Sequence, residues 1–152
     1  MRTPAFFLVF CLLLAPTPAS PAQDDGSSLV QPGGTIPPFV VAGLEEYKNK
    51  NLEEAVKIWL KGSTSEGMGI NRRAEPLRKY VEFYGAFQSY ELMSTRVFSA
   101  RSRVLYLILH FEKRPVFARF EVYRSDLGWI LLGEYEFNEN PDKILPACQS
   151  VN

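Results

Sequence analysis

The region from Phe87 to Asn138 alternates between apolar and polar side chains in four runs. The runs are separated by residues typical of turns at 99–102, 113–115 and 125–128. An alternation with a period of two is typical of β-strands that bury one face. The pattern therefore predicts four strands joined by short turns in an antiparallel meander.

The expected register gives the meander one continuous apolar face. A tight turn at Lys113-Arg114 would place Leu105, Leu107, Leu109 and Phe111 opposite Val122, Phe120, Ala118 and Val116. A turn at 125–128 would continue this face into Trp129, Leu131, Gly133, Tyr135 and Phe137. On the reverse face, Arg119 would lie opposite Glu134 and Glu121 opposite Leu132. The reverse face is thus expected to be mixed, and the apolar face to form the core.

Upstream of the strands, apolar residues recur with helical spacing. One stripe begins at Val40, a second runs from Leu52 to Leu60, and a third runs from Leu77 to Tyr84. Asn51 and Gly62 are the expected cap and stop of the second helix, and Pro76 fits the first turn of the third. The glycine-containing segment 63–71 between them predicts a mobile loop. The fold class is therefore α+β, with N-terminal helices packed on a curved four-stranded antiparallel meander.

The first 22 residues have the pattern of a secretory signal peptide, with Arg2, an apolar run from Ala5 to Ala15, and small residues before Ala22. The run is shorter than the roughly 20 residues that a membrane span needs. A lipoprotein is disfavoured because the bulky Phe10 precedes Cys11. We therefore expect a secreted or periplasmic protein with a flexible leader at 23–38, a single domain at 39–146 and a tail at 147–152.

Charge and cysteine content narrow the function classes. The chain has 17 basic and 17 acidic residues, and loss of the signal peptide would remove only one basic residue. A neutral chain has no overall attraction to nucleic acid or to an anionic membrane, so neither is expected as a partner. Loss of Cys11 would leave Cys148 alone, as a free thiol or one half of an intermolecular bridge.

The order of elements resembles the nuclear-transport-factor-2-like superfamily, a cystatin-like, cone-shaped α+β fold. The likeness rests on Gly128-Trp129-Ile130-Leu131, the run from Tyr47 to Trp59 and the helix from Leu77 to Gly85, and it covers roughly 39–137. The resemblance implies an exported bacterial member whose helices close over the concave sheet and leave a pocket. Members of the superfamily include enzymes and binding modules, so fold alone does not assign a function.

A small apolar or amphipathic molecule is the expected ligand of that pocket. The candidate lining residues are Tyr47, Trp59, Tyr90, Arg96, Leu107, Phe120, Trp129 and Tyr135. Arg96 would reach the pocket if the 99–102 turn had an even length, and it could then bind a carboxylate. Two other placements of Arg96 stay open, a pairing with an acid such as Glu82 and a bulge that turns it outward.

Self-association is the second function that the pattern suggests. The reverse face would expose more apolar surface than a monomer usually shows. Its candidate contact residues for a homodimer are Tyr106, Ile108, His110, Phe117, Tyr123, Ile130 and Leu132.

An isomerase or hydrolase of the resembled superfamily is the alternative, with Tyr47, Glu91 or Arg96 as its working residues. Such isomerases use a pocket carboxylate as a base, whereas every Asp of this chain falls in the leader, a turn or the tail. His110 is the only histidine, and neither a zinc spacing, a phosphate loop nor a nucleophile elbow occurs. We therefore expect a non-enzymatic binding domain without a metal or cofactor.

Overall fold

The structure, a computed structural model, describes residues 30–31 and 34–145. Three helices, α1 (Pro38–Lys48), α2 (Leu52–Leu60) and α3 (Ile70–Tyr84), precede the strands β2 (Phe87–Ser99), β3 (Ser102–Phe111), β4 (Pro115–Ser125) and β5 (Gly128–Asn138). A two-residue strand β1 (Val30–Gln31) and a 3-10 helix η1 (Pro141–Lys143) flank them. The predicted fold class is confirmed. The predicted signal peptide, most of the predicted leader and the predicted tail lie outside the described residues.

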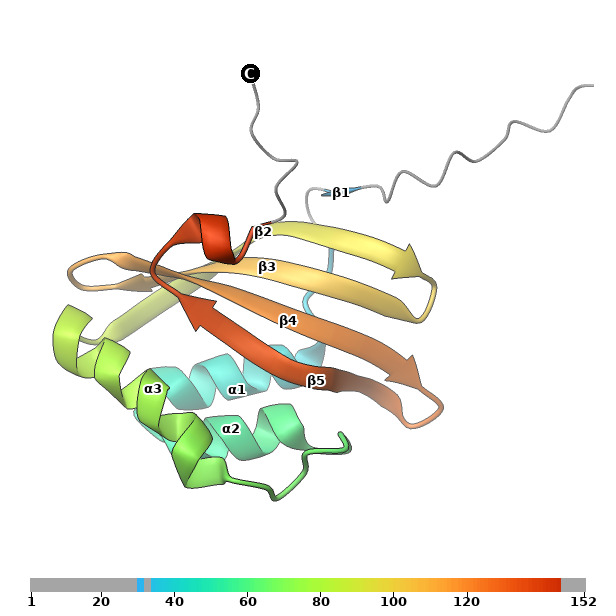
Figure 1. Ribbon diagram of the computed structural model, residues 1–152, viewed down its shortest axis with the longest axis horizontal. Helices are drawn as coiled ribbons and strands as arrows, with labels where there is room; N and C mark the ends of the chain where they lie inside the picture. Colours follow the sequence, from blue (N-terminus) through green and yellow to red (C-terminus); the bar gives the residue numbers. More distant parts are fainter. Residues whose placement is uncertain (1–29, 32–33, 146–152) are drawn as a thin grey trace, which may run out of the picture.

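The helices cover one face of an antiparallel sheet with the strand order β1-β2-β3-β4-β5 (Figure 1). The helix η1 lies on the opposite face (Figure 1). The turns β2–β3 and β4–β5 lie together at one end of the sheet (Figure 1). Among the described helices, none has the length and apolar character needed to cross a bilayer.

The register of the β3–β4 hairpin differs from the prediction by two residues. Leu105 pairs with Phe120 and Leu107 with Ala118, and the turn residues are Glu112-Lys113. Because Phe111 remains in the strand, its buried ring packs against Phe87 at a centroid distance of 5.5 Å. A shift of two residues keeps every side chain on its face, so the predicted core face is correct.

The β4–β5 hairpin follows the predicted register only near its turn. Val122 pairs with Leu131, but the next observed pair is Phe120 with Tyr135, because a bulge at 132–134 adds two residues to β5. Gly133 has a φ of 94° in this bulge, a conformation that favours glycine. Arg119 therefore pairs with Glu136 and not with Glu134. Because the bulge adds an even number of residues, Tyr135 and Phe137 stay on the core side of the sheet.

The side chains of strand β2 switch between the two faces of the sheet where its pairing with β3 is irregular. Leu92 pairs with Leu107 on the core side, whereas the next pair is Ser94 with Tyr106 on the outer side. The same shift puts Thr95 opposite the inward-facing Leu105. Arg96 therefore belongs to the outer face and does not lie at the pocket mouth, where an even turn would have placed it. A bulge between Leu92 and Ser94 turns its side chain outward, which is one of the placements that the sequence allows.

Helix α3 begins at Ile70, seven residues before Leu77, where the predicted stripe begins. Ile70 and the fully buried Ala74 extend the stripe of Leu77 toward the N-terminus. Pro76 consequently lies inside the helix, where it has no N–H to donate to the carbonyl of Arg72. Asn51 makes no capping bond on α2, because its amide donates to Glu46 at 2.7 Å.

The end of the predicted flexible leader is part of the fold. Val30 pairs with Arg96 and Gln31 with Thr95, so β1 covers part of the outer edge of β2. Helix α1 already starts at Pro38, one residue before the predicted domain boundary. These contacts join segments far apart in the chain, and local composition does not reveal them.

Candidate functional site

The space between helices and sheet is filled with aromatic side chains. Trp59 of α2 is fully buried and packs against Tyr135, Phe120 and Phe137, with ring centroids 4.9, 5.4 and 5.8 Å away. Its indole N–H donates to the carbonyl of Val40 at 3.1 Å. A filled interior of this kind leaves no room there for a ligand.

Tyr47 of α1 occupies the neighbouring part of the core. Its ring stacks on Phe87 at 5.1 Å, and its hydroxyl donates to the carbonyl of Leu77 at 2.9 Å. Burial raises the pKa of Tyr47 far above its ordinary value, and the nearby Tyr80 and Tyr135 add to the shift. The hydroxyl is a structural donor that ties α1 to α3.

The predicted pocket inside the cone is therefore wrong for most of its residues. Tyr47, Trp59, Leu107 and Phe120 are fully buried core. Tyr90 is half-buried on the inner face of β2, against the same core. Trp129 lies near the β4–β5 turn, under the guanidinium of Arg103 at 4.1 Å. Of these candidates, Tyr135 lines a cavity that the described residues form.

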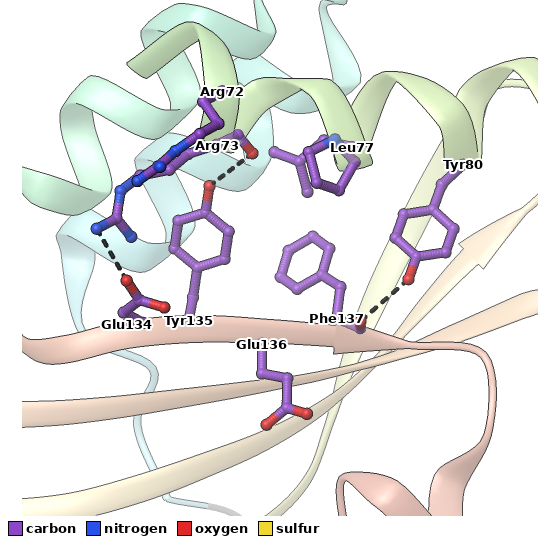
Figure 2. A pocket seen from close by; sticks show the side chains of 9 residues that line it. Arg72, Arg73, Leu77, Tyr80, Glu134, Tyr135, Glu136 and Phe137 are labelled. Carbon is purple, nitrogen blue, oxygen red and sulfur yellow. Dashed lines mark hydrogen bonds and ion pairs between the residues drawn. The ribbon is translucent and has the colours of Figure 1, made fainter. Parts of the chain in front are cut away.

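That cavity is a groove at the rim of the molecule, between α3 and the edge strand β5 (Figure 2). We call it the rim groove. It has a volume of about 330 Å³ and is lined by Arg72, Arg73, Pro76, Leu77, Tyr80, Glu134, Tyr135, Glu136 and Phe137. This volume lies at the lower end of the range of about 300–1,000 Å³ that is usual for small-molecule sites.

The middle of the rim groove is apolar, and its walls are held by hydrogen bonds. The rings of Tyr135 and Tyr80 lie on either side of Phe137 (Figure 2). Tyr135 donates to the carbonyl of Arg73 at 3.1 Å, and Tyr80 donates to the carbonyl of Phe137 at 3.0 Å. Burial raises the pKa of both hydroxyls, so both remain protonated donors at neutral pH. Each hydroxyl oxygen keeps a lone pair for a ligand donor.

One end of the rim groove is cationic. The side chain of Arg73 is only 17% exposed, and one of its terminal nitrogens contacts Glu134 at 2.9 Å. Its buried Nε has no hydrogen-bond partner among the described residues. Because a guanidinium has five N–H donors, Arg73 has capacity for a further acceptor. Arg72 is exposed beside it.

Glu136 does not offset this charge within the groove. Its side chain points to the other side of β5, away from Tyr135 and Phe137 (Figure 2). There it contacts Arg119 at 3.4 Å, and Arg119 also contacts Glu121 at 3.2 Å. The polar end of the groove therefore combines two arginines with one carboxylate, Glu134.

The residues named for an enzyme do not converge. Glu91 lies on the outer face, where it contacts His110 at 3.1 Å. Arg96 is on the same face, with its guanidinium over the ring of Phe98 at 4.9 Å. Tyr47 is buried beneath the sheet. Within the described residues, no group of three or more His, Cys, Asp or Glu side chains could hold a metal.

The outer face is less open than its sequence predicts. Tyr106 is only 5% exposed, because it forms a small apolar cluster with Val104 and Ile144, which follows η1. Phe117 packs against this cluster, while Ile108, Tyr123 and Ile130 are half-buried and Leu132 is exposed. Ile144 and Leu145 thus occupy part of the face expected to contact a second copy.

Sequence reasoning missed the rim groove. Arg72 and Arg73 resemble solvated loop charges as long as the segment before Pro76 is taken as a loop. The available signal was the spacing of Ile70, Ala74 and Leu77, which extends the helix and places Arg73 one turn before Leu77.

No protein-family model, curated protein or solved structure matches this chain. The resemblance to the nuclear-transport-factor-2-like superfamily therefore stays a prediction. The fold class is established by the structure. A function is inferred below from the geometry of the chain's own sites.

Proposed function

We propose that this chain is a binding domain that holds a small amphipathic carboxylic acid in the rim groove. The observation that carries the proposal is the guanidinium of Arg73, whose Nε has no hydrogen-bond partner among the described residues, at one end of an apolar cavity. A partly buried cationic group with an unpaired donor favours an anionic partner, since an unmet donor costs about 1–3 kcal/mol.

The shape of the groove supports an apolar body attached to this acidic head. Leu77 and Phe137 supply its apolar surface, and the ring of Tyr80 closes the end away from Arg73 (Figure 2). A carboxylate can accept two parallel N–H bonds from a guanidinium, which fixes orientation as well as affinity. A short aliphatic or aromatic carboxylic acid combines the required charge and length.

The groove is also compatible with binding without rearrangement of the core. The hydroxyls of Tyr80 and Tyr135 are already bonded to the backbones of β5 and α3. Preformed walls lower the entropic cost of ordering side chains around a ligand. The proposed ligand therefore replaces water in an existing hollow.

Titration of the protein with short carboxylic acids and with the matching alcohols tests the proposal. We expect saturable binding of the acids by calorimetry and at least about tenfold weaker binding of the alcohols, which corresponds to about 1.4 kcal/mol. Arg73→Gln should weaken binding of the acid by a similar factor and leave the affinity for the alcohol unchanged.

Arg78→Gln is the matched control. Arg78 belongs to the same helix but pairs with Glu53 and Glu75, away from the groove. Equal binding of acids and alcohols, or equal losses in the two arginine variants, would remove the proposal. Chemical shift changes confined to α3 and β5 would locate the ligand independently of any substitution.

A further inference from the structure

A second feature lies at the end of the sheet that carries the β2–β3 and β4–β5 turns (Figure 1). We call this the turn end. The segments 96–103 and 124–129 contain four arginines and one acidic residue, Asp126. The arginines are Arg96, Arg101, Arg103 and Arg124. A chain with balanced charges thus concentrates positive charge at one end.

The two turns of this end are joined and enclose a hollow. The backbone N–H of Arg124 donates to the carbonyl of Arg101 at 2.7 Å. The hollow beside this bond has a volume of about 440 Å³ and is lined by Ala100, Arg101, Arg124, Ser125, Asp126 and Gly128. Arg101 contacts Asp126 at 3.6 Å, with both side chains exposed, so this pair competes weakly with another anion. The hollow is large enough for a phosphate group.

Apolar side chains project from the same end. Leu127 is 100% exposed at the tip of the β4–β5 turn, and Phe98 is 56% exposed at the end of β2. Turns normally carry small or polar residues. Neighbouring strands lie about 4.8 Å apart, so the two turns are about 10 Å from each other. Exposed apolar side chains beside the exposed Arg101 and Arg124 match the layering of a bilayer surface, with phosphates outside and acyl chains below.

We propose that the turn end docks on an anionic lipid surface. Arg101 and Arg124 bind a lipid phosphate in the hollow, and Leu127 and Phe98 enter the region between headgroups and acyl chains. Guanidinium groups suit this role because they bind phosphate in a bidentate manner and remain charged.

The neutral total charge of the chain does not oppose this docking. Charges at a membrane surface act within a Debye length, about 8 Å at physiological salt, so only the residues near the surface contribute. Arg101 and Arg124 line the hollow itself, and Asp126 is the one carboxylate among its lining residues. A nucleic acid is a poorer match, because the fully exposed Leu127 offers no aromatic platform for bases and the ring of Phe98 already lies under the guanidinium of Arg96.

Vesicle co-sedimentation tests this inference with the chain from Gln23 onward, which contains every described helix and strand. The vesicles are phosphatidylcholine alone and phosphatidylcholine mixed with phosphatidylglycerol. We expect binding to the mixed vesicles that falls with added salt, and little binding to neutral ones. Arg101→Gln and Arg124→Gln should each weaken binding to the mixed vesicles about fivefold. Leu127→Ser should weaken binding both with and without added salt.

Control variants place equivalent changes elsewhere. Phe83→Ser removes an aromatic side chain that is 66% exposed on α3, and Lys79→Gln removes an exposed charge from the same helix. Both should bind vesicles like the unchanged chain. Losses of equal size in these variants and in the turn-end variants would overturn the inference.

Fluorescence provides a readout that needs no substitution. Trp129 follows the β4–β5 turn directly, and the other tryptophan, Trp59, is fully buried. Brominated lipids should quench Trp129 in mixed vesicles. Binding without quenching, or binding to single-stranded DNA with none to vesicles, would contradict docking of this end on lipid.

Discussion

The indole of Trp59 in α2 lies directly against the backbone of α1 at Gly43, in the space that a β-carbon would otherwise occupy. Gly43 is therefore a position where only glycine allows the two helices to approach. The contact seats Trp59 so that its N–H reaches the carbonyl of Val40 and its ring reaches the sheet. The close packing of α1 against α2 depends on the absence of a side chain at Gly43.

Gly43→Ala should lower the free energy of unfolding by about 3 kcal/mol, at the upper end of the usual cost of overpacking. The reason is that the added methyl displaces a fully buried indole. Urea denaturation measures the change. The double variant with Trp59→Phe should show a non-additive recovery, because the smaller ring leaves room for the methyl. Additive losses in the double variant would show that the two residues do not conflict.

Stability should decline above about pH 10, the ordinary pKa of tyrosine. Burial raises the pKa values of Tyr47 and Tyr135, so the folded chain keeps protons that the unfolded chain releases. The stabilisation is therefore complete below the pKa of the unfolded state and is lost as the pH rises past it. Urea midpoints between neutral and alkaline pH measure the decline.

Tyr47→Phe separates the two contributions of this hydroxyl. At neutral pH the variant should be about 1 kcal/mol less stable, because the bond to the carbonyl of Leu77 is lost. Its alkaline decline should be shallower, because one titrating group is missing. An unchanged alkaline slope would show that Tyr47 does not titrate differently in the folded and unfolded states.

Ile144→Ala should destabilise the chain by about 2–3 kcal/mol and uncover the ring of Tyr106. Ile144 is 2% exposed and completes the apolar cluster on the outer face with Val104. Removal of a buried side chain costs its transfer free energy and leaves a cavity. Sedimentation should then show more self-association than in Leu145→Ala, which alters a neighbouring and less buried position. A monomeric Ile144→Ala variant of unchanged stability would refute the covering role.

Pro76→Ala should stabilise the chain and weaken ligand binding in the rim groove. Alanine restores a donor for the carbonyl of Arg72 and removes the ring that clashes with that carbonyl in a helix interior, an effect of up to about 3 kcal/mol. The ring of Pro76 lines the groove, so its loss alters the surface offered to a ligand. Thermal unfolding and acid titration measure the two effects. A loss of stability would mean that the proline fits the helix without strain.

The sequence alone determined the fold class and showed which face of the sheet forms the core. The period-two runs marked the four long strands, and the stripes at Val40 and Leu52 marked α1 and α2. These signals are local, because the side-chain period of each element is written in consecutive residues. The predicted core face is correct even where the predicted register is wrong, since the observed shifts of two residues keep each side chain on its face.

Only the tertiary structure decided where a ligand or a surface could be accommodated. The facing of Arg96 depends on bulges in the pairing of β2 and β3, and the pairing of Arg119 with Glu136 depends on a bulge in β5. The interior is filled because Trp59 meets three rings from distant strands, and the groove beside Arg73 exists because α3 passes the edge of β5. Such contacts join residues that are far apart in the chain, and their geometry is set by packing that no local pattern encodes.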